Sequence, residues 1–103
     1  MRLTQQEIHA IVTLAKKHFS NEVKVYLFGS RIYDELKGGD IDLLIQSHAD
    51  YYTFRNKIHY DADLQRAIGE RKIDILFDDQ QLQQKTSFYN SIQNTKIRLT
   101  EKL

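Results

Sequence analysis

A short apolar run at residues 41–45 limits the folds open to this 103-residue chain more than any other feature. The run follows a Gly-Gly turn signal and contains Ile41, Leu43, Leu44 and Ile45. A run of this length is typical of a β-strand that is buried on both faces. Other apolar elements must cover such a strand, and a chain of this length has room for one core and one active site. The sequence therefore predicts a single domain over residues 1–103.

A helix is predicted over residues 4–19, because apolar residues recur there at helical spacing. Thr4 followed three residues later by Glu7 is the signature of a capping box at the start of this helix. The expected inner stripe is Ile8, Ile11, Val12, Ala15 and Phe19.

The rest of the chain alternates between strands and helices. Strands are predicted over residues 23–28 and 71–77, and helices over residues 30–36, 50–68 and 79–99. For the last two helices, the expected inner residues are Phe54, Ile58, Asp61 or Ala62, and Gln65 or Ile68, and then Phe88, Ile92, Thr95 and Leu99. The order helix, strand, short helix, strand, helix, strand, helix predicts a small two-layer α/β domain.

Composition excludes several classes of function. The chain has 15 basic and 14 acidic residues, so it lacks the basic excess of a protein that binds nucleic acid through phosphates. It has no Cys, which excludes disulfides, thiol nucleophiles and Cys-based zinc sites, and fits a cytoplasmic location. No apolar run approaches the ~18 residues of a membrane span, and we expect neither a membrane segment nor a signal peptide.

Three aspartates form the most informative constellation. Asp40 and Asp42 open the strand at 41–45, and residues two apart in a strand point to the same face. Asp74 alternates with Ile73 and Ile75 in the strand at 71–77, and joins that face if the two strands are neighbours. Three carboxylates gathered in this way repel one another, and a divalent cation relieves the repulsion. Oxygen ligands in a chain without Cys favour Mg²⁺ or Mn²⁺.

A phosphate-binding loop is predicted directly after the first strand. Gly29 lacks a β-carbon and lets a polyphosphate approach the backbone, and Ser30 offers a hydroxyl and an N–H at the start of a helix. Arg31 adds a cation for phosphate oxygens, and Arg71 and Lys72, just before the Asp74 strand, are further candidates.

These motifs resemble a known enzyme superfamily. Gly29-Ser30-Arg31, followed after nine residues by Asp40-Ile41-Asp42-Leu43-Leu44, is similar to the signature of the DNA polymerase β-like nucleotidyltransferases. The resemblance covers about residues 25–77, and the short length resembles the minimal nucleotidyltransferases of bacteria and archaea. It implies a mixed sheet of three or more strands backed by helices.

The resemblance also implies roles for residues. Asp40 and Asp42 would be the paired metal ligands, Asp74 the third carboxylate, and Ser30 with Gly29 the contacts to the triphosphate of ATP. The chain departs from the usual pattern at Ile32-Tyr33-Asp34, where relatives carry small residues, and at Gly39, where many carry Ser. Neither departure removes a ligand, and both bear on the shape of the nucleotide loop and on base preference.

The implied reaction is metal-dependent transfer of AMP from ATP to a hydroxyl group. About 26 residues follow the third strand, enough for one helix, so we expect another polypeptide to supply the acceptor site. Minimal nucleotidyltransferases commonly pair with a helical HEPN toxin and act as its antitoxin by AMPylation of a toxin tyrosine. Exposed aromatic residues would suit such a partner, with Tyr51, Tyr52 and Tyr60 or Phe88 and Tyr89 as candidates, although Phe54 and Phe88 fit the core better.

Two alternative functions stay open at this point. The chain could neutralise a HEPN ribonuclease by contact alone, without catalysis. It could also be the nucleotide-binding subunit of an enzyme that modifies a small molecule such as an aminoglycoside.

Overall fold

The computed structural model describes residues 3–29 and 40–100. Its elements in chain order are α1 (Gln5–Phe19), β1 (Lys24–Phe28), β2 (Ile41–Gln46), the 3-10 turn η2 (Ala49–Tyr51), α2 (Phe54–Ile68), β3 (Ile73–Phe77), α3 (Gln80–Gln84), α4 (Thr86–Thr95) and β4 (Ile97–Arg98). The strands form a mixed sheet in the order β3-β2-β1-β4, in which β1 is antiparallel to β2 and β4, and β2 is parallel to β3. The predicted α/β class, a mixed sheet flanked by helices, is confirmed. The helix predicted over residues 30–36 lies outside the described residues.

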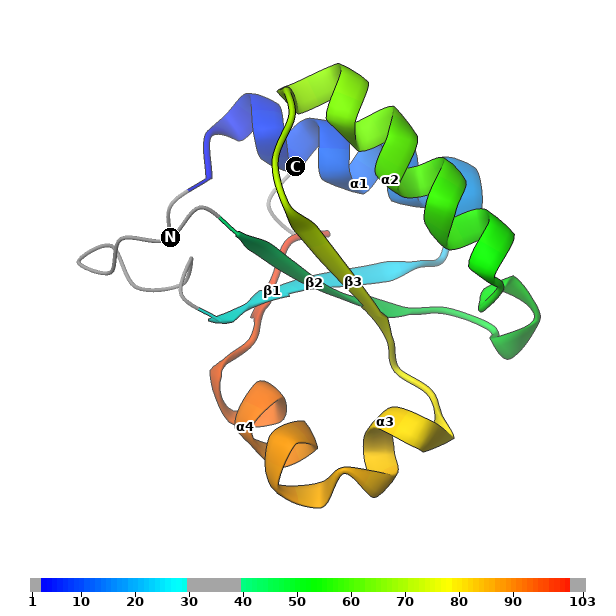
Figure 1. The fold of residues 1–103 in the computed structure, drawn as a ribbon, viewed down its shortest axis with the longest axis vertical. Helices are drawn as coiled ribbons and strands as arrows, with labels where there is room; N and C mark the ends of the chain where they lie inside the picture. Colours follow the sequence, from blue (N-terminus) through cyan, green and yellow to red (C-terminus); the bar gives the residue numbers. More distant parts are fainter. Residues whose placement is uncertain (1–2, 30–39, 101–103) are drawn as a thin grey trace.

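Each face of the sheet has its own apolar core. Figure 1 shows α1 and α2 on one side of the sheet and the shorter α3 and α4 on the other. Strand β2 contributes Ile41, Leu43 and Ile45 to the core under α1 and α2, and Leu44 to the smaller core under α3 and α4. Because side chains alternate along a strand, Asp42 lies on the same face of the sheet as Leu44. The prediction that this strand is buried on both faces is therefore confirmed, apart from its acidic end.

Helix α1 follows its sequence signals closely. The backbone N–H of Glu7 donates to Thr4 Oγ1 over 3.0 Å, and the Thr4 N–H donates to Glu7 Oε1 over 2.8 Å, which closes the expected capping box. All five residues of the expected inner stripe are buried. The cap sets where the helix begins and the stripe sets which side meets the sheet.

Helix α2 begins later than predicted and presents a different face. Thr53 Oγ1 accepts a hydrogen bond from the Asn56 N–H, so the helix starts at Phe54, and η2 occupies residues that were expected to be helical. The predicted inner residues Phe54 and Ile58 are wrong: their exposed fractions are 74% and 46%. Tyr60 and Leu64 are buried instead.

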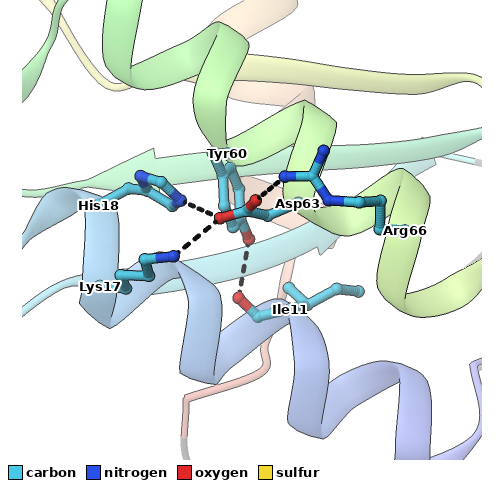
Figure 2. A network of polar contacts seen from close by, with 6 residues as sticks. All are labelled: Ile11, Lys17, His18, Tyr60, Asp63 and Arg66. Atoms are coloured by element: carbon cyan, nitrogen blue, oxygen red, sulfur yellow. Dashed lines mark hydrogen bonds and ion pairs between the residues drawn. The ribbon is translucent and has the colours of Figure 1, made fainter.

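Contacts with α1 explain the orientation of α2 (Figure 2). The Tyr60 hydroxyl donates to the backbone carbonyl of Ile11 over 2.8 Å, and the Tyr60 ring packs edge-on against Phe19 with 5.2 Å between centroids. Asp63 accepts hydrogen bonds from Lys17 and His18 of α1 and from Arg66 of α2. These contacts hold the side of α2 that carries Tyr60 and Asp63 against α1, and Phe54 and Ile58 lie on the opposite side.

The C-terminal part contains two helices and a strand where one long helix was predicted. Asp79 caps α3 by accepting a hydrogen bond from the Leu82 N–H over 2.9 Å. The helical conformation is interrupted at Lys85, and α4 begins at the next residue. Leu99 is buried, but it follows β4 and donates its N–H to the Val25 carbonyl over 2.7 Å. Phe88, a predicted core residue, is 45% exposed, so that prediction is wrong. None of the helices in the described part of the chain has the length and apolar character needed to cross a bilayer.

Candidate active site

Asp42 and Asp74 lie next to each other on neighbouring strands. The parallel register of β2 and β3 pairs Ile41 with Ile73 and Asp42 with Asp74. Residues paired in this way project to the same face of the sheet, so both carboxyl groups lie on the face that carries α3 and α4. The prediction that Asp74 joins the face of Asp42 is confirmed by this register.

The two carboxyl groups also interact directly. Burial raises the pKa of the Asp42 carboxyl to about 6, and the side-chain hydrogen bond with Asp74 and the negative charges of Asp74 and Asp40 act in the same direction. The cation of Lys72 opposes this rise. A hydrogen bond between two carboxyl groups requires that one of them hold a proton. Near neutral pH, the ionisation of both carboxyl groups is therefore unfavourable, and a bound cation would relieve their repulsion.

Asp40 stands at the entrance to β2 and is half-buried, as Asp42 is, whereas Asp74 is exposed. The Asp40 side chain is 49% exposed, and its Oδ2 lies 3.8 Å from Nζ of Lys72. Asp40 is close enough for its charge to raise the pKa of Asp42. Lys72, one of the two basic residues proposed from the sequence as phosphate contacts, therefore lies beside the carboxylates. The other, Arg71, instead forms an ion pair with Glu7 at the start of α1.

Gly29, directly after β1, lies against the side chain of Asp42. It follows Phe28, the residue of β1 that pairs with Asp42, and its φ of +82° is one that favours glycine. A β-carbon at this position would lie 2.3 Å from Oδ2 of Asp42. Here the small side chain makes room for a carboxylate of the same protein. This contact was missed from the sequence, although a Gly directly after the strand that leads to the Asp-x-Asp run was the available signal.

Of the three predicted nucleotide-binding residues, Gly29 is described, and Ser30 and Arg31 lie outside the described residues. Their contacts with a triphosphate stay a prediction.

The donor set fits a hard divalent cation in chemistry. Asp42 and Asp74 present adjacent carboxylate oxygens. Asp40 is two residues before Asp42, and its negative charge acts on the Asp42 carboxyl. Within residues 3–29 and 40–100, no three His, Asp or Glu side chains are arranged so that they could hold a metal ion as they stand. The structure thus brings two of the expected ligands together, and the set of three stays a prediction.

Of the aromatic residues proposed for a partner surface, Tyr51 and Phe88 are exposed, whereas Tyr60 is buried, so the prediction for Tyr60 is wrong. Tyr52 stacks on Phe77 with 4.8 Å between ring centroids. Tyr89 donates its hydroxyl to Asp78. The large apolar side chains that are exposed in the described part of the chain are Tyr51, Phe54, Ile58 and Phe88.

Comparison with known proteins agrees with this geometry. A family model described as polymerase beta, nucleotidyltransferase matches residues 9–102. The chain belongs to this family of nucleotidyltransferases. The matched segment includes Gly29 and all three aspartates, so the resemblance noted in the sequence is confirmed at the level of the superfamily. Members of the family use a nucleoside triphosphate and a divalent metal ion. No curated protein matches the chain significantly.

Proposed function

We propose that this nucleotidyltransferase transfers AMP from ATP to a tyrosine hydroxyl of a partner protein. The proposed partner is a helical HEPN toxin, and the chain is then its antitoxin in the cytoplasm. The observation that carries the proposal is the carboxyl pair of Asp42 and Asp74, which meet through the β2–β3 register beside Gly29. Two hydrogen-bonded carboxyl groups on adjacent strands have no evident role in stabilising the sheet, but they suit phosphoryl-type chemistry.

The proposed step forms one bond and breaks one. The acceptor oxygen attacks the α-phosphorus of ATP, the bond from that phosphorus to the oxygen that bridges to the β-phosphate breaks, and pyrophosphate leaves. The acceptor hydroxyl loses its proton, for which a carboxylate at the position of Asp74 is a suitable base. In-line geometry places the acceptor and the pyrophosphate on opposite sides of the α-phosphate.

Asp40, Asp42 and Asp74 are the residues that would hold Mg²⁺ or Mn²⁺. When bound, the metal ions neutralise the charge of the phosphates and of the attacking oxygen. The residues themselves supply the negative charge that attracts the ions and fix where the α-phosphate lies. Lys72, whose Nζ lies beside Asp40, would supply a positive charge for a phosphate oxygen.

The experiment uses the chain purified with its partner, ATP labelled at the α-phosphate, and Mg²⁺. We expect the partner to gain mass in whole AMP units. Asp42→Asn should abolish the gain while the protein stays folded, and Asp50→Asn, at an exposed aspartate in η2, should leave it unchanged. If Asp42→Asn still transfers label, the assignment of the site is wrong. If the partner ribonuclease is inhibited with no mass gain, by the Asp42 variant as well, the chain acts by binding alone.

A further inference from the structure

Phe88 is an exposed aromatic residue on the same face of the sheet as the carboxyl pair. The large apolar side chains that are exposed in residues 3–29 and 40–100 are Tyr51, Phe54, Ile58 and Phe88. Two of them belong to α2, which covers the opposite face, and Tyr51 belongs to η2, beyond the end of β2 that is remote from Asp42. Phe88 belongs to α4, on the face toward which Asp42 and Asp74 project (Figure 1). Of these four side chains, Phe88 therefore lies on the face of the site.

Phe28 connects Phe88 to the carboxyl pair. The antiparallel register of β1 and β2 pairs Phe28 with Asp42, so their side chains share one face, with Cβ atoms about 5 Å apart. Phe28 is buried in the core under α3 and α4, and its ring packs edge-to-face against the ring of Phe88 with 6.4 Å between centroids. Phe88 thus lies two side chains away from the Asp42 carboxyl, a separation comparable with that between the phosphate and the base of a nucleotide.

The contact with Phe28 holds the ring of Phe88 without covering it. Almost half of the Phe88 side chain stays exposed, although an edge-to-face pair of aromatic rings is favourable and fixes their orientation. A ring that is held in place before a ligand arrives loses little conformational entropy on binding. An open aromatic face is also the surface on which nucleobases stack, because every base presents a π face of its own.

We propose that Phe88 is the stacking platform for the base of the nucleoside triphosphate, and that it favours a purine over a pyrimidine. The inference deepens the proposed function and rests on its nucleotide site, but not on its acceptor. With the phosphates at the carboxyl pair, the ribose passes over Phe28 and the base lies on the exposed face of Phe88. The fused rings of a purine cover more of this face than the single ring of a pyrimidine, so they remove more apolar surface from water.

The first test uses Phe88→Trp, because the chain has no Trp of its own. Tryptophan fluorescence then reports position 88 alone, and a purine stacked on the indole quenches it. The probe is α,β-methylene-ATP with Mg²⁺, which binds without releasing AMP. We expect saturable quenching by this probe and none by inorganic tripolyphosphate, which carries phosphates without a base. The matched control is Phe54→Trp, at an exposed Phe on the other side of the sheet, and its fluorescence should not be quenched.

Isothermal titration calorimetry with the same two probes measures the contribution of the ring to affinity. Phe88→Leu keeps an apolar side chain against Phe28 and removes the aromatic face. It should raise the Kd of α,β-methylene-ATP about tenfold and leave the Kd of tripolyphosphate unchanged. Phe54→Leu should leave both Kd values unchanged. The native protein should bind α,β-methylene-CTP more weakly than the ATP analogue, and Phe88→Leu should reduce this difference.

The outcomes separate the platform from the proposed function. Quenching together with the tenfold loss in Phe88→Leu supports the platform, whether or not a tyrosine accepts AMP. Nucleotide binding without quenching, or with an unchanged Kd in Phe88→Leu, overturns the inference and leaves the proposed function standing. Equal affinity of the native protein for the two nucleotide analogues contradicts the preference for purines.

Three further results also count against the platform. Equal weakening of both probes in Phe88→Leu would show that the residue supports the phosphate site through Phe28, and would overturn the inference. Loss of transfer to the partner with unchanged nucleotide binding would assign Phe88 to the acceptor and overturn it as well. If neither probe binds the native protein, the proposed function and the inference both fail.

Discussion

A β-carbon on Gly29 would lie 2.3 Å from Oδ2 of Asp42, well inside van der Waals contact. The two residues come from the adjacent ends of β1 and β2, where Phe28 pairs with Asp42. The backbone at Gly29 therefore forms one wall of the space that the carboxylate occupies. Any side chain there must push the carboxylate out of its position beside Asp74.

Gly29→Ala should lower activity far more than it lowers stability. The positive φ costs an alanine about 1–2 kcal/mol, and the carboxylate of Asp42 must rotate away. A displacement of about 1 Å at a reacting group can cost ~100-fold in rate. Gly69→Ala is the control, because Gly69 has φ +91° and nothing within 4 Å of a built β-carbon. Urea midpoints should be similar for the two variants, while AMP transfer is lost only in Gly29→Ala; equal activities would show that the contact is unimportant.

Asp42 should make the protein less stable as the pH rises from 4 to 7. Its pKa is about 6 in the folded protein against 3.8 as a free side chain, so the folded state favours the protonated form. The stabilisation is fully present below pH 3.8 and is lost as the pH rises through 6. The shift corresponds to about 3 kcal/mol in full, and because the carboxyl is partly open to solvent, screening lowers this to about 1–2 kcal/mol.

Asp42→Asn isolates this effect. The amide stays neutral and can still donate to Asp74, so the variant should be more stable than the native protein at pH 7 and equal to it near pH 4. Urea unfolding at a series of pH values measures the difference. A difference that does not change with pH would contradict the raised pKa of Asp42.

Mg²⁺ should stabilise the native protein at pH 7.5 and have little effect on Asp42→Asn. A ligand at ten times its dissociation constant adds about 1.4 kcal/mol to the free energy of unfolding. At pH 5 the stabilisation should shrink, because protons compete for Asp42. Thermal unfolding with and without Mg²⁺ tests this, with Ca²⁺ as a comparison for a larger cation. An equal response in the native protein and the variant would place the cation elsewhere.

The parts of the fold that sequence could predict are those set by local signals. A capping box and an unbroken apolar stripe fixed α1, and alternation along two strands placed Asp42 and Asp74 on one face. The phase of α2 could not be predicted, because Phe54 and Ile58 are more apolar than Tyr60. Tyr60 is buried because its hydroxyl donates a hydrogen bond to the Ile11 carbonyl, and that is a tertiary contact.

The C-terminal part shows a second limit of sequence patterns. The residues expected to stack on one helix, from Phe88 to Leu99, do recur at helical spacing. They cross from α4 into β4, however, because Leu99 pairs its backbone with Val25 in the sheet. For the site, alternation placed Asp42 and Asp74 on one face only if β2 and β3 are neighbours, and the structure supplies that pairing. The approach of Gly29 to Asp42 depends in turn on how β1 ends against β2. Periodicity within one segment carries no information on either tertiary contact.

The contact between α1 and α2 should weaken in acid, and Asp63 is the residue responsible. Hydrogen bonds hold the pKa of Asp63 well below its usual range. The largest effect is that of His18, and Lys17 and Arg66 add to it. A lowered pKa contributes stability that is present above the unfolded value of 3.8 and is lost as the pH falls below it. Asp63→Asn should therefore lower the urea midpoint at pH 7 and have a diminishing effect below pH 4. Asp50→Asn, at an aspartate whose side chain is 86% exposed, should leave the midpoint unchanged at both pH values. An Asp63 variant as stable as the native protein at pH 7 would mean that the buried contacts of Tyr60 and Leu64 alone hold α2 on α1.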